Sequence, residues 1–173
     1  MKKITLLILF FLPMLLISQS LKLISIFPSY LNENSGIEVK TKNGIWTHND
    51  SGDGPIIYKI DSNGNQLDSI YLNGITPVDF EDITFDHQGN LYIGDIGNNS
   101  HNRTNLVIYK IPNPDSITGN NITPEAIYYS YQDQITFPDP NQNSDCEALF
   151  HYLGNLYLIS KNWGSSGYSK LYQ

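Results

Sequence analysis

The chain has 173 residues, with 10 Lys and Arg against 17 Asp and Glu, and a formal net charge of −7. An acidic chain is repelled by phosphate backbones, so we expect no nucleic-acid partner. The single cysteine, Cys146, excludes an internal disulfide framework and a cysteine-based zinc site. An aromatic content of 12% is too high for a chain that stays unfolded for lack of burial, so we expect a folded domain.

The first segment has the pattern of an export signal. Lys2 and Lys3 precede a mainly apolar run over 4–17, which is shorter than the roughly 20 residues of a membrane span, and small and polar residues follow. We predict a signal peptide over 1–18 and a mature domain over 19–173. An uncleaved membrane anchor is the alternative.

Cleavage of this signal would remove two lysines and leave 8 basic against 17 acidic residues, a formal charge of −9. Such a surface favours cations and discourages anionic membranes. No cysteine follows the apolar run, so we expect no lipid anchor. The prediction is a secreted, periplasmic or cell-surface protein with no stable membrane span after cleavage.

Three segments of the mature domain repeat one pattern of turns and strands. In each, an Asn and Gly turn leads into a strand with a Tyr or Trp, and a further strand ends in a tyrosine motif. Apolar or β-branched residues on both sides of such a turn are typical of a β-hairpin. The predicted second strands are 45–50, 91–95 and 156–160, the third strands are 56–60, 107–111 and 170–173, and the fourth strands are 66–72 and 125–131.

The repeat predicts an all-β protein, a β-propeller of four-stranded blades. Ile45 and Leu91 occupy equivalent positions 46 residues apart, which is the period of a propeller blade. We predict about three blades, over 33–73, 79–132 and 144–173, the last incomplete. A β-sandwich of short strands is the alternative. Because propellers close with about 4 to 8 blades, we expect a fragment, the N-terminal half of a six-bladed ring.

The blade geometry predicts a polar rim. The start of an innermost strand and the end of the second strand meet at one face of a blade, so three adjacent blades would direct carboxylates and amides at one channel mouth. Oxygen ligands of this kind are what Ca²⁺ or Mg²⁺ requires. The predicted metal ligands are Asn49, Asp50, Glu81, Asp95 and Glu147, with calcium as the expected ion.

Two other interpretations of this rim stay open. A carboxylate whose pKa is raised by neighbouring acids can act as a general acid or base on a bound substrate. Asp and Asn also recur in loops because they favour turns. Glu is a poor turn former, so Glu81 and Glu147 are the most informative residues of the set.

The cysteine and the histidines say less about function than the carboxylates do. We expect Cys146 to be buried and unreactive, because its acidic neighbours Asp145 and Glu147 disfavour a thiolate. His48, His87, His101 and His151 show neither an HExxH motif nor paired metal spacing, so zinc is not expected.

Four segments resemble those of exported, uncharacterised β-propeller proteins of the Bacteroidetes type. The segments are 49–52, 79–83, 91–99 and 145–149, and the resemblance covers about 32–172. The chain is more distantly similar to NHL-like, gluconolactonase-like and phytase-like six-bladed propellers. The resemblance specifies a fold and a subfamily better than an activity.

The gluconolactonase-like resemblance implies a divalent cation over the channel. A glutamate that opens an inner strand would hold it, here Glu81 or Glu147, together with Asn49 or Asp95. Phytase-like enzymes need a basic phosphate pocket, whereas Lys161 and Arg103 are the only cations near the relevant loops of this chain.

The functional expectation is an exported binding module for a divalent cation or small ligand. Its partner would be a small molecule or an extracellular or cell-surface component. A metal-dependent hydrolase, phytase-like or lactonase/esterase-like, is the first alternative. A surface scaffold without a small-molecule site is the second.

Overall fold

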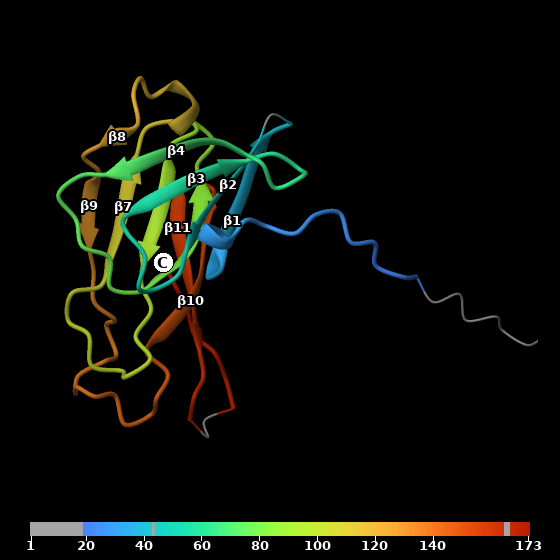
Figure 1. Ribbon diagram of the computed structural model, residues 1–173. Helices are drawn as coiled ribbons and strands as arrows, with labels where there is room; N and C mark the ends of the chain where they lie inside the picture. The colour runs from blue at the N-terminus through green and yellow to red at the C-terminus, as the bar shows by residue number, and fades with distance from the viewer. Residues whose placement is uncertain (1–18, 43, 165–166) are drawn as a thin grey trace, which may run out of the picture.

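A computed structural model describes residues 19–42, 44–164 and 167–173, so the predicted signal peptide over 1–18 lies outside the described residues. The described chain is all-β, with three sheets of five, four and three strands (Figure 1). Its helical elements are two short 3-10 turns, η1 (Ser29–Leu31) and η2 (Pro114–Ser116). In this part of the chain no helix is long and apolar enough to cross a membrane.

Each sheet is built from strands that follow one another along the chain. The first sheet has the order β1 (Asn34–Thr41), β2 (Gly44–Asn49), β3 (Ile56–Ile60), β4 (Gln66–Leu72) and β8 (Asn121–Ile122). The second has the order β5 (Phe80–Phe85), β6 (Leu91–Asp95), β7 (Val107–Ile111) and β9 (Glu125–Tyr128). The third has the order β10 (Asp145–Tyr152), β11 (Asn155–Lys161) and β12 (Leu171–Tyr172). All pairs are antiparallel except β4 with β8.

Most predicted strands are confirmed, and two differences have tertiary causes. The strand predicted over 125–131 ends at Tyr128, because Tyr131 leaves the sheet and packs in the core beside the partly buried Tyr129. The short strand β8 was not predicted. It is held beside β4 by backbone hydrogen bonds such as Asn73 N to Ile122 O at 2.7 Å.

The first strands of the first two sheets, β1 and β5, lie side by side and run in the same direction. Ser35 Oγ donates to Glu81 O at 2.7 Å, and Thr84 Oγ1 donates to Glu38 Oε1 at 3.1 Å. A step of three residues along β1 therefore matches a step of three along β5.

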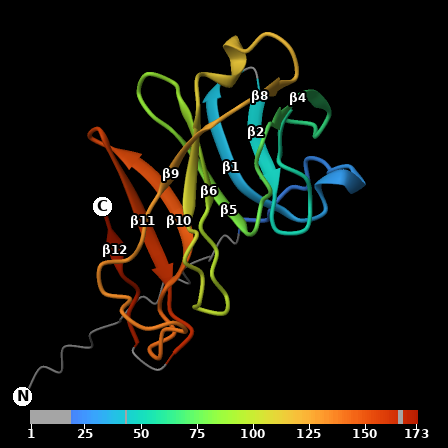
Figure 2. The same cartoon turned by 90° about the vertical axis from the view of Figure 1, so that its left-hand side faces the viewer.

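The same relationship joins β5 to β10. Asp82 Oδ2 accepts from Leu149 N at 2.8 Å, and Thr84 Oγ1 accepts from His151 N at 3.3 Å. The second sheet thus lies between the other two (Figure 2). The three first strands begin at one common end of the molecule and finish at the other.

The two central strands of the second sheet, β6 and β7, are buried on both faces, which explains their mainly apolar sequences. Successive residues of a strand point to opposite faces. Leu91 and Ile93 pack in the cluster shared with the first sheet, whereas Tyr92 packs in the cluster shared with the third. Trp46, which is 1% exposed, packs in the first of these clusters.

Cys146 is fully buried in the second cluster, which confirms its predicted burial. Burial raises the pKa of its thiol to about 12, and the charge of Asp145 is only a minor contributor. The predicted outcome is right, but desolvation rather than the acidic neighbours is the main cause.

Candidate functional site

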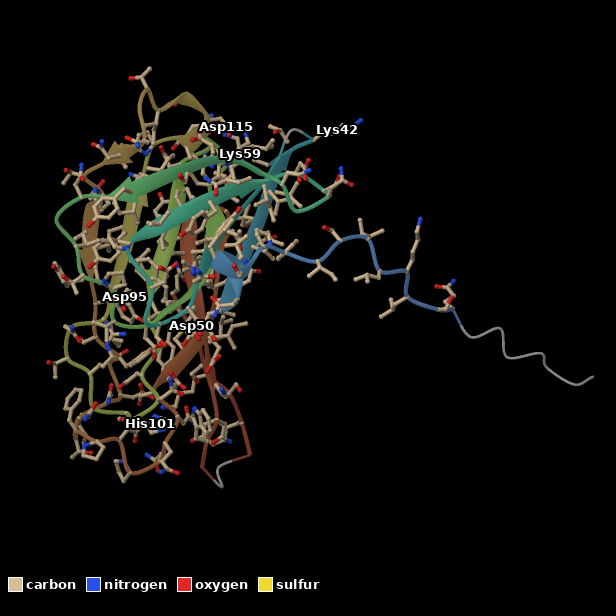
Figure 3. All side chains as sticks on the ribbon, in the orientation of Figure 1. Lys42, Asp50, Lys59, Asp95, His101 and Asp115 are labelled. Carbon is tan, nitrogen blue, oxygen red and sulfur yellow. The ribbon has the colours of Figure 1, made fainter. Side chains whose placement is uncertain are left out.

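Five carboxylates gather where the first strands begin. Oxygens of Asp50, Asp79 and Glu81 lie within 4.8 Å of one another, and so do oxygens of Glu81, Asp145 and Glu147. Glu81 belongs to both groups and joins them. We call these five residues the acidic cluster. Figure 3 places Asp50 at the end of the sheets away from Lys59 and Asp115.

Strand pairing brings these residues together as the repeat predicts. Asn34 at the start of β1 pairs with Asn49 at the end of β2. Phe80 pairs with Asp95 in the second sheet, and Asp145 pairs with Lys161 in the third. The starts of first strands and the ends of second strands therefore meet at one rim.

The two glutamates of the cluster occupy equivalent irregularities of their strands. The register of β5 with β6 shifts between Phe80 and Asp82, and Glu81 is the residue between them. The register of β10 with β11 shifts between Cys146 and Ala148, around Glu147. A β-bulge leaves one residue out of the ladder and redirects its side chain. These bulges separate the two glutamates from the regular alternation of their strands.

Burial and mutual repulsion make two members of the acidic cluster, Glu81 and Asp79, difficult to ionise. The pKa of Glu81 is raised to about 8, first by burial and then by Glu147, Asp50, Asp79 and Asp145. The pKa of Asp79 is raised to about 6 by burial and by Asp50. At neutral pH the protonated form of Glu81 is therefore favoured. A cation among these oxygens would remove the repulsion and replace the proton.

The backbone at Gly97 closes one side of the cluster. A Cβ on this residue would lie 2.3 Å from Glu81 Oε1 and 2.4 Å from Asp79 Oδ2. A larger residue here would push these two carboxylates away from their present positions. Asp79 directly precedes β5, so the blade geometry places it at the polar rim, but it was not among the five predicted ligands. Gly97 was not selected, and the available signal was its position just after β6.

One lysine and one tryptophan border the cluster on the third sheet. Lys161 Nζ lies 2.8 Å from Glu147 Oε1 and 4.1 Å from the centre of the Trp163 ring. Trp163 Nε1 donates to Asp145 Oδ2 at 2.6 Å. Lys161 thus neutralises part of the negative charge, while the remaining carboxylates keep the site net negative.

The carboxylate of Asp95 forms a buried ion pair with Arg103 instead of joining the acidic cluster. Its carboxylate is 2.9 Å from Arg103 Nη2, with side chains 2% and 10% exposed. It also accepts from the backbone N–H groups of Val78 at 3.1 Å and Asp79 at 2.9 Å. Among the described residues, the carboxylate groups close enough to share an ion do not include Asp95. Its contacts fix the loop that carries Asp79.

Asn49 also has other partners. Its amide nitrogen donates to Tyr30 O at 2.6 Å and to Asp53 Oδ2 at 2.6 Å. Its side-chain oxygen is buried without a hydrogen-bond partner. Of the five predicted ligands, the structure therefore brings Asp50, Glu81 and Glu147 together and engages Asn49 and Asp95 elsewhere.

No family model matches the chain, and no curated protein matches it in sequence. The functional argument therefore rests on the geometry and charge of the acidic cluster.

Proposed function

We propose that the protein is an exported binding module whose acidic cluster holds a divalent cation, with Ca²⁺ as the preferred ion. The carrying observation is the position of Glu81, whose carboxylate is close to two carboxylates on either side. The cluster offers carboxylate oxygens from three sheets in two groups, which share the Glu81 carboxylate. Proximity of this kind is costly without a positive charge and favourable with one.

The proposal includes the propeller arrangement. Three sheets whose strands run in the same sequential order, with neighbouring first strands parallel, are what consecutive blades would give. The acidic cluster would then lie at the mouth of the channel between the blades. In such a ring the bound cation is accessible to a ligand arriving from solvent.

Calcium fits this set of ligands better than magnesium does. Ca²⁺ takes about 6 to 8 oxygens in a tolerant geometry, whereas Mg²⁺ requires near-ideal octahedral geometry with bonds of about 2.0–2.1 Å. The carboxylates here come from separate sheets, and Asp145 already accepts hydrogen bonds from Asn98 N and Trp163 Nε1. An ion with flexible coordination geometry, such as Ca²⁺, suits carboxylates whose positions are already fixed by other hydrogen bonds.

The raised pKa of Glu81 also favours a second candidate, a metal-dependent hydrolase. A carboxylic acid with a pKa of about 8 holds a proton near neutral pH and can deliver it to a leaving group. An ester or lactone is the better substrate class. Lys161 and Arg103 are already paired with Glu147 and Asp95, which leaves a phosphate little positive charge to bind here.

Calcium titration of Glu81→Gln tests the proposal. Glutamine resembles the protonated form of Glu81, so the variant should fold normally. Calorimetry should show a calcium affinity lower by at least about tenfold, a loss typical of disturbed metal sites. Glu125→Gln is the matched control, because Glu125 is exposed on β9, outside the acidic cluster, and pairs with Lys110 at 3.6 Å.

Equal calcium affinity in the wild type and Glu81→Gln would contradict the proposal and favour a scaffold. Turnover of ester or lactone substrates by the calcium-loaded protein, lost in Glu81→Gln, would support the hydrolase. Binding without turnover would support the module.

A further inference from the structure

A polar cavity lies beside the acidic cluster, at the end of the first sheet. Its volume is about 430 Å³, within the roughly 300–1,000 Å³ of small-molecule sites. Asn49 and Ser51, the chain neighbours of Asp50 (labelled in Figure 3), both line it. The cavity is therefore next to the acidic cluster but is made by other side chains. The lining residues that decide its chemistry are Tyr30, Glu33, Asn49, Asp53 and Tyr58.

Hydrogen bonds fix the segments that form this cavity. Asp50 N donates to Glu33 O at 2.8 Å, which joins the residue before β1 to the residue after β2. Asn49 Nδ2 donates to Tyr30 O and to Asp53 Oδ2, each at 2.6 Å. The 3-10 turn η1, the start of β1 and the loop after β2 are thus held together before a ligand arrives.

The cavity is negatively charged. Glu33 and Asp53 both line it, and both residues are exposed. None of the described lining residues is a lysine or an arginine. The Glu33 carboxylate has no hydrogen bond or ion pair with another described residue. The Asp53 carboxylate accepts from neutral donors, Asn49 Nδ2 at 2.6 Å and Gly54 N at 2.7 Å. The charges of both carboxylates are therefore available to a cation that enters the cavity.

Two buried polar atoms of the lining residues have no partner among the described residues. Asn49 is 4% exposed, and its Oδ1 accepts no hydrogen bond. The hydroxyl of Tyr30 is buried and also has no partner. Buried polar groups are normally hydrogen-bonded. Because Oδ1 can only accept, the partner that suits the Asn49 side chain is a hydrogen-bond donor.

Two tyrosine rings form the aromatic part of the wall. The ring centroids of Tyr30 and Tyr58 are 5.2 Å apart, with an interplanar angle of 40°. Tyr58 is 8% exposed and Tyr30 is more exposed, so Tyr30 is the ring that a ligand reaches. Cations within about 6 Å of an aromatic ring are attracted to its face. Carboxylates, an amide oxygen and an aromatic ring therefore all favour a positively charged donor.

We propose that this cavity binds a primary ammonium group, of the kind that a small amine or a lysine side chain carries. Such a group has three N–H donors and no acceptor, which matches the oxygens of Glu33, Asp53 and Asn49. A metal ion fits less well. Among the described residues, the carboxylates close enough to share an ion do not include Glu33 or Asp53. The proposal is independent of calcium binding by the acidic cluster.

An NMR titration of the full chain tests the site. The probes are n-butylammonium and Nα-acetyl-lysine amide, each added with Ca²⁺ in excess so that calcium competes for the acidic cluster. Both probes should shift the backbone amide signals of Ser51 and Gly52, which line the cavity. The probe that binds more tightly identifies the source of the ammonium group, a free amine or a lysine side chain.

Two comparison compounds separate charge from hydrogen bonding. Tetramethylammonium has the charge but no N–H group, and 1-butanol has the alkyl chain but no charge. Each should bind at least about tenfold more weakly than n-butylammonium, because hydrogen bonds that involve a charged group are the stronger ones.

Glu33→Gln and Asp53→Asn should each lower the affinity for n-butylammonium by at least about tenfold, since each removes a charged acceptor. Asp68→Asn is the matched control. Asp68 is exposed on β4 and, like Asp53, accepts from the backbone N–H of the next residue. This control should bind the probe as the wild type does.

Thermal unfolding without a probe checks that the variants fold. Glu33→Gln disturbs no side-chain contact with another described residue, so it decides the outcome if Asp53→Asn proves unstable.

Three results would overturn the site. The first is a wild type whose Ser51 and Gly52 signals do not move with either probe. The second is an equal n-butylammonium affinity in the wild type, Glu33→Gln and Asp53→Asn, which would place the bound amine elsewhere. The third is tetramethylammonium that binds as tightly as n-butylammonium, because the N–H donors would then contribute nothing.

Discussion

Gly97 stands directly against Glu81, so closely that a Cβ at position 97 would come within 2.3 Å of Glu81 Oε1. The same atom would come within 2.4 Å of Asp79 Oδ2. The backbone after β6 therefore forms a wall of the acidic cluster. The space that a methyl group would fill is the space around the central carboxylates.

Gly97→Ala should weaken calcium binding and leave the fold intact. The added methyl group meets the far ends of two flexible side chains, which can move aside at little cost but then leave the cluster. Calcium calorimetry and thermal unfolding measure the two effects. Gly54→Ala is the control, because its Cβ would meet Ile56 Cδ1 at 3.6 Å and Ile56 Cγ1 at 3.8 Å, both ordinary contacts. Equal losses of affinity in both variants would contradict this account.

Without a divalent cation, stability should decrease as pH rises from about 4.5 to about 8. Glu81 ionises at its ordinary pKa of 4.5 in the unfolded chain, whereas the folded pKa is raised to about 8. Over this range the folded state binds more protons, so the free energy of unfolding falls with rising pH. Below the unfolded pKa the contribution of Glu81 is fully present, and it is lost as pH passes the folded pKa.

Urea unfolding at several pH values, in the wild type and Glu81→Gln, measures this contribution. The variant should lose less stability than the wild type over the same range. His48 acts in the opposite sense, because burial lowers its pKa and protonation at acid pH is unfavourable, but it is the same in both proteins. If the free energy of unfolding changed with pH in the same way in the wild type and Glu81→Gln, Glu81 would not carry the expected proton.

Asp95→Asn should destabilise the fold, in contrast to Asp50→Asn. Removing one partner of a buried ion pair leaves the other charge uncompensated, at a cost of about 3–5 kcal/mol, and Arg103 would be left in this way. Asp50→Asn should instead reduce calcium affinity with little change in stability, since Asp50 is a partly exposed member of the cluster. Chemical denaturation and calcium titration of both variants compare the two roles. The reverse pattern would make Asp95 the ligand, as first expected.

Lys161→Met should increase calcium affinity severalfold. The ammonium group lies 2.8 Å from Glu147 Oε1 and competes with a metal ion for that oxygen. Methionine keeps an apolar stem beside Trp163 and removes the charge. Lys110→Met is the control, because Lys110 pairs with Glu125 on another part of the second sheet. A weaker calcium affinity in Lys161→Met would contradict the competition.

Local sequence signals predicted most of the strands. The strands at 56–60, 66–72, 91–95 and 107–111 have the observed bounds, because β-branched or alternating residues there are framed by turn residues. The strand β8 and the early end of β9 depend on contacts between distant segments. Two residues paired to β4, and a tyrosine drawn into the core, leave no local pattern.

The candidate site was predictable to the extent that it follows the repeat. Glu81 and Glu147 are repeated at equivalent bulges, so sequence comparison of the copies finds them. Asp95 was assigned as a ligand because its partner, Arg103, lies in a loop whose path the sequence does not specify. The cavity beside Asn49 depends on the packing of Tyr30 against Tyr58, which residue spacing alone does not reveal.

Terbium luminescence tests the central claim, a cation within the acidic cluster, most directly. Tb³⁺ takes the same oxygen ligands as Ca²⁺ and emits when a nearby tryptophan is excited. Trp163 is in place for this, because its Nε1 donates to Asp145 Oδ2 at 2.6 Å. The account predicts tryptophan-sensitised Tb³⁺ emission that Ca²⁺ displaces and that Glu81→Gln strongly reduces. Absence of sensitised emission, or emission unchanged in Glu81→Gln, would contradict it.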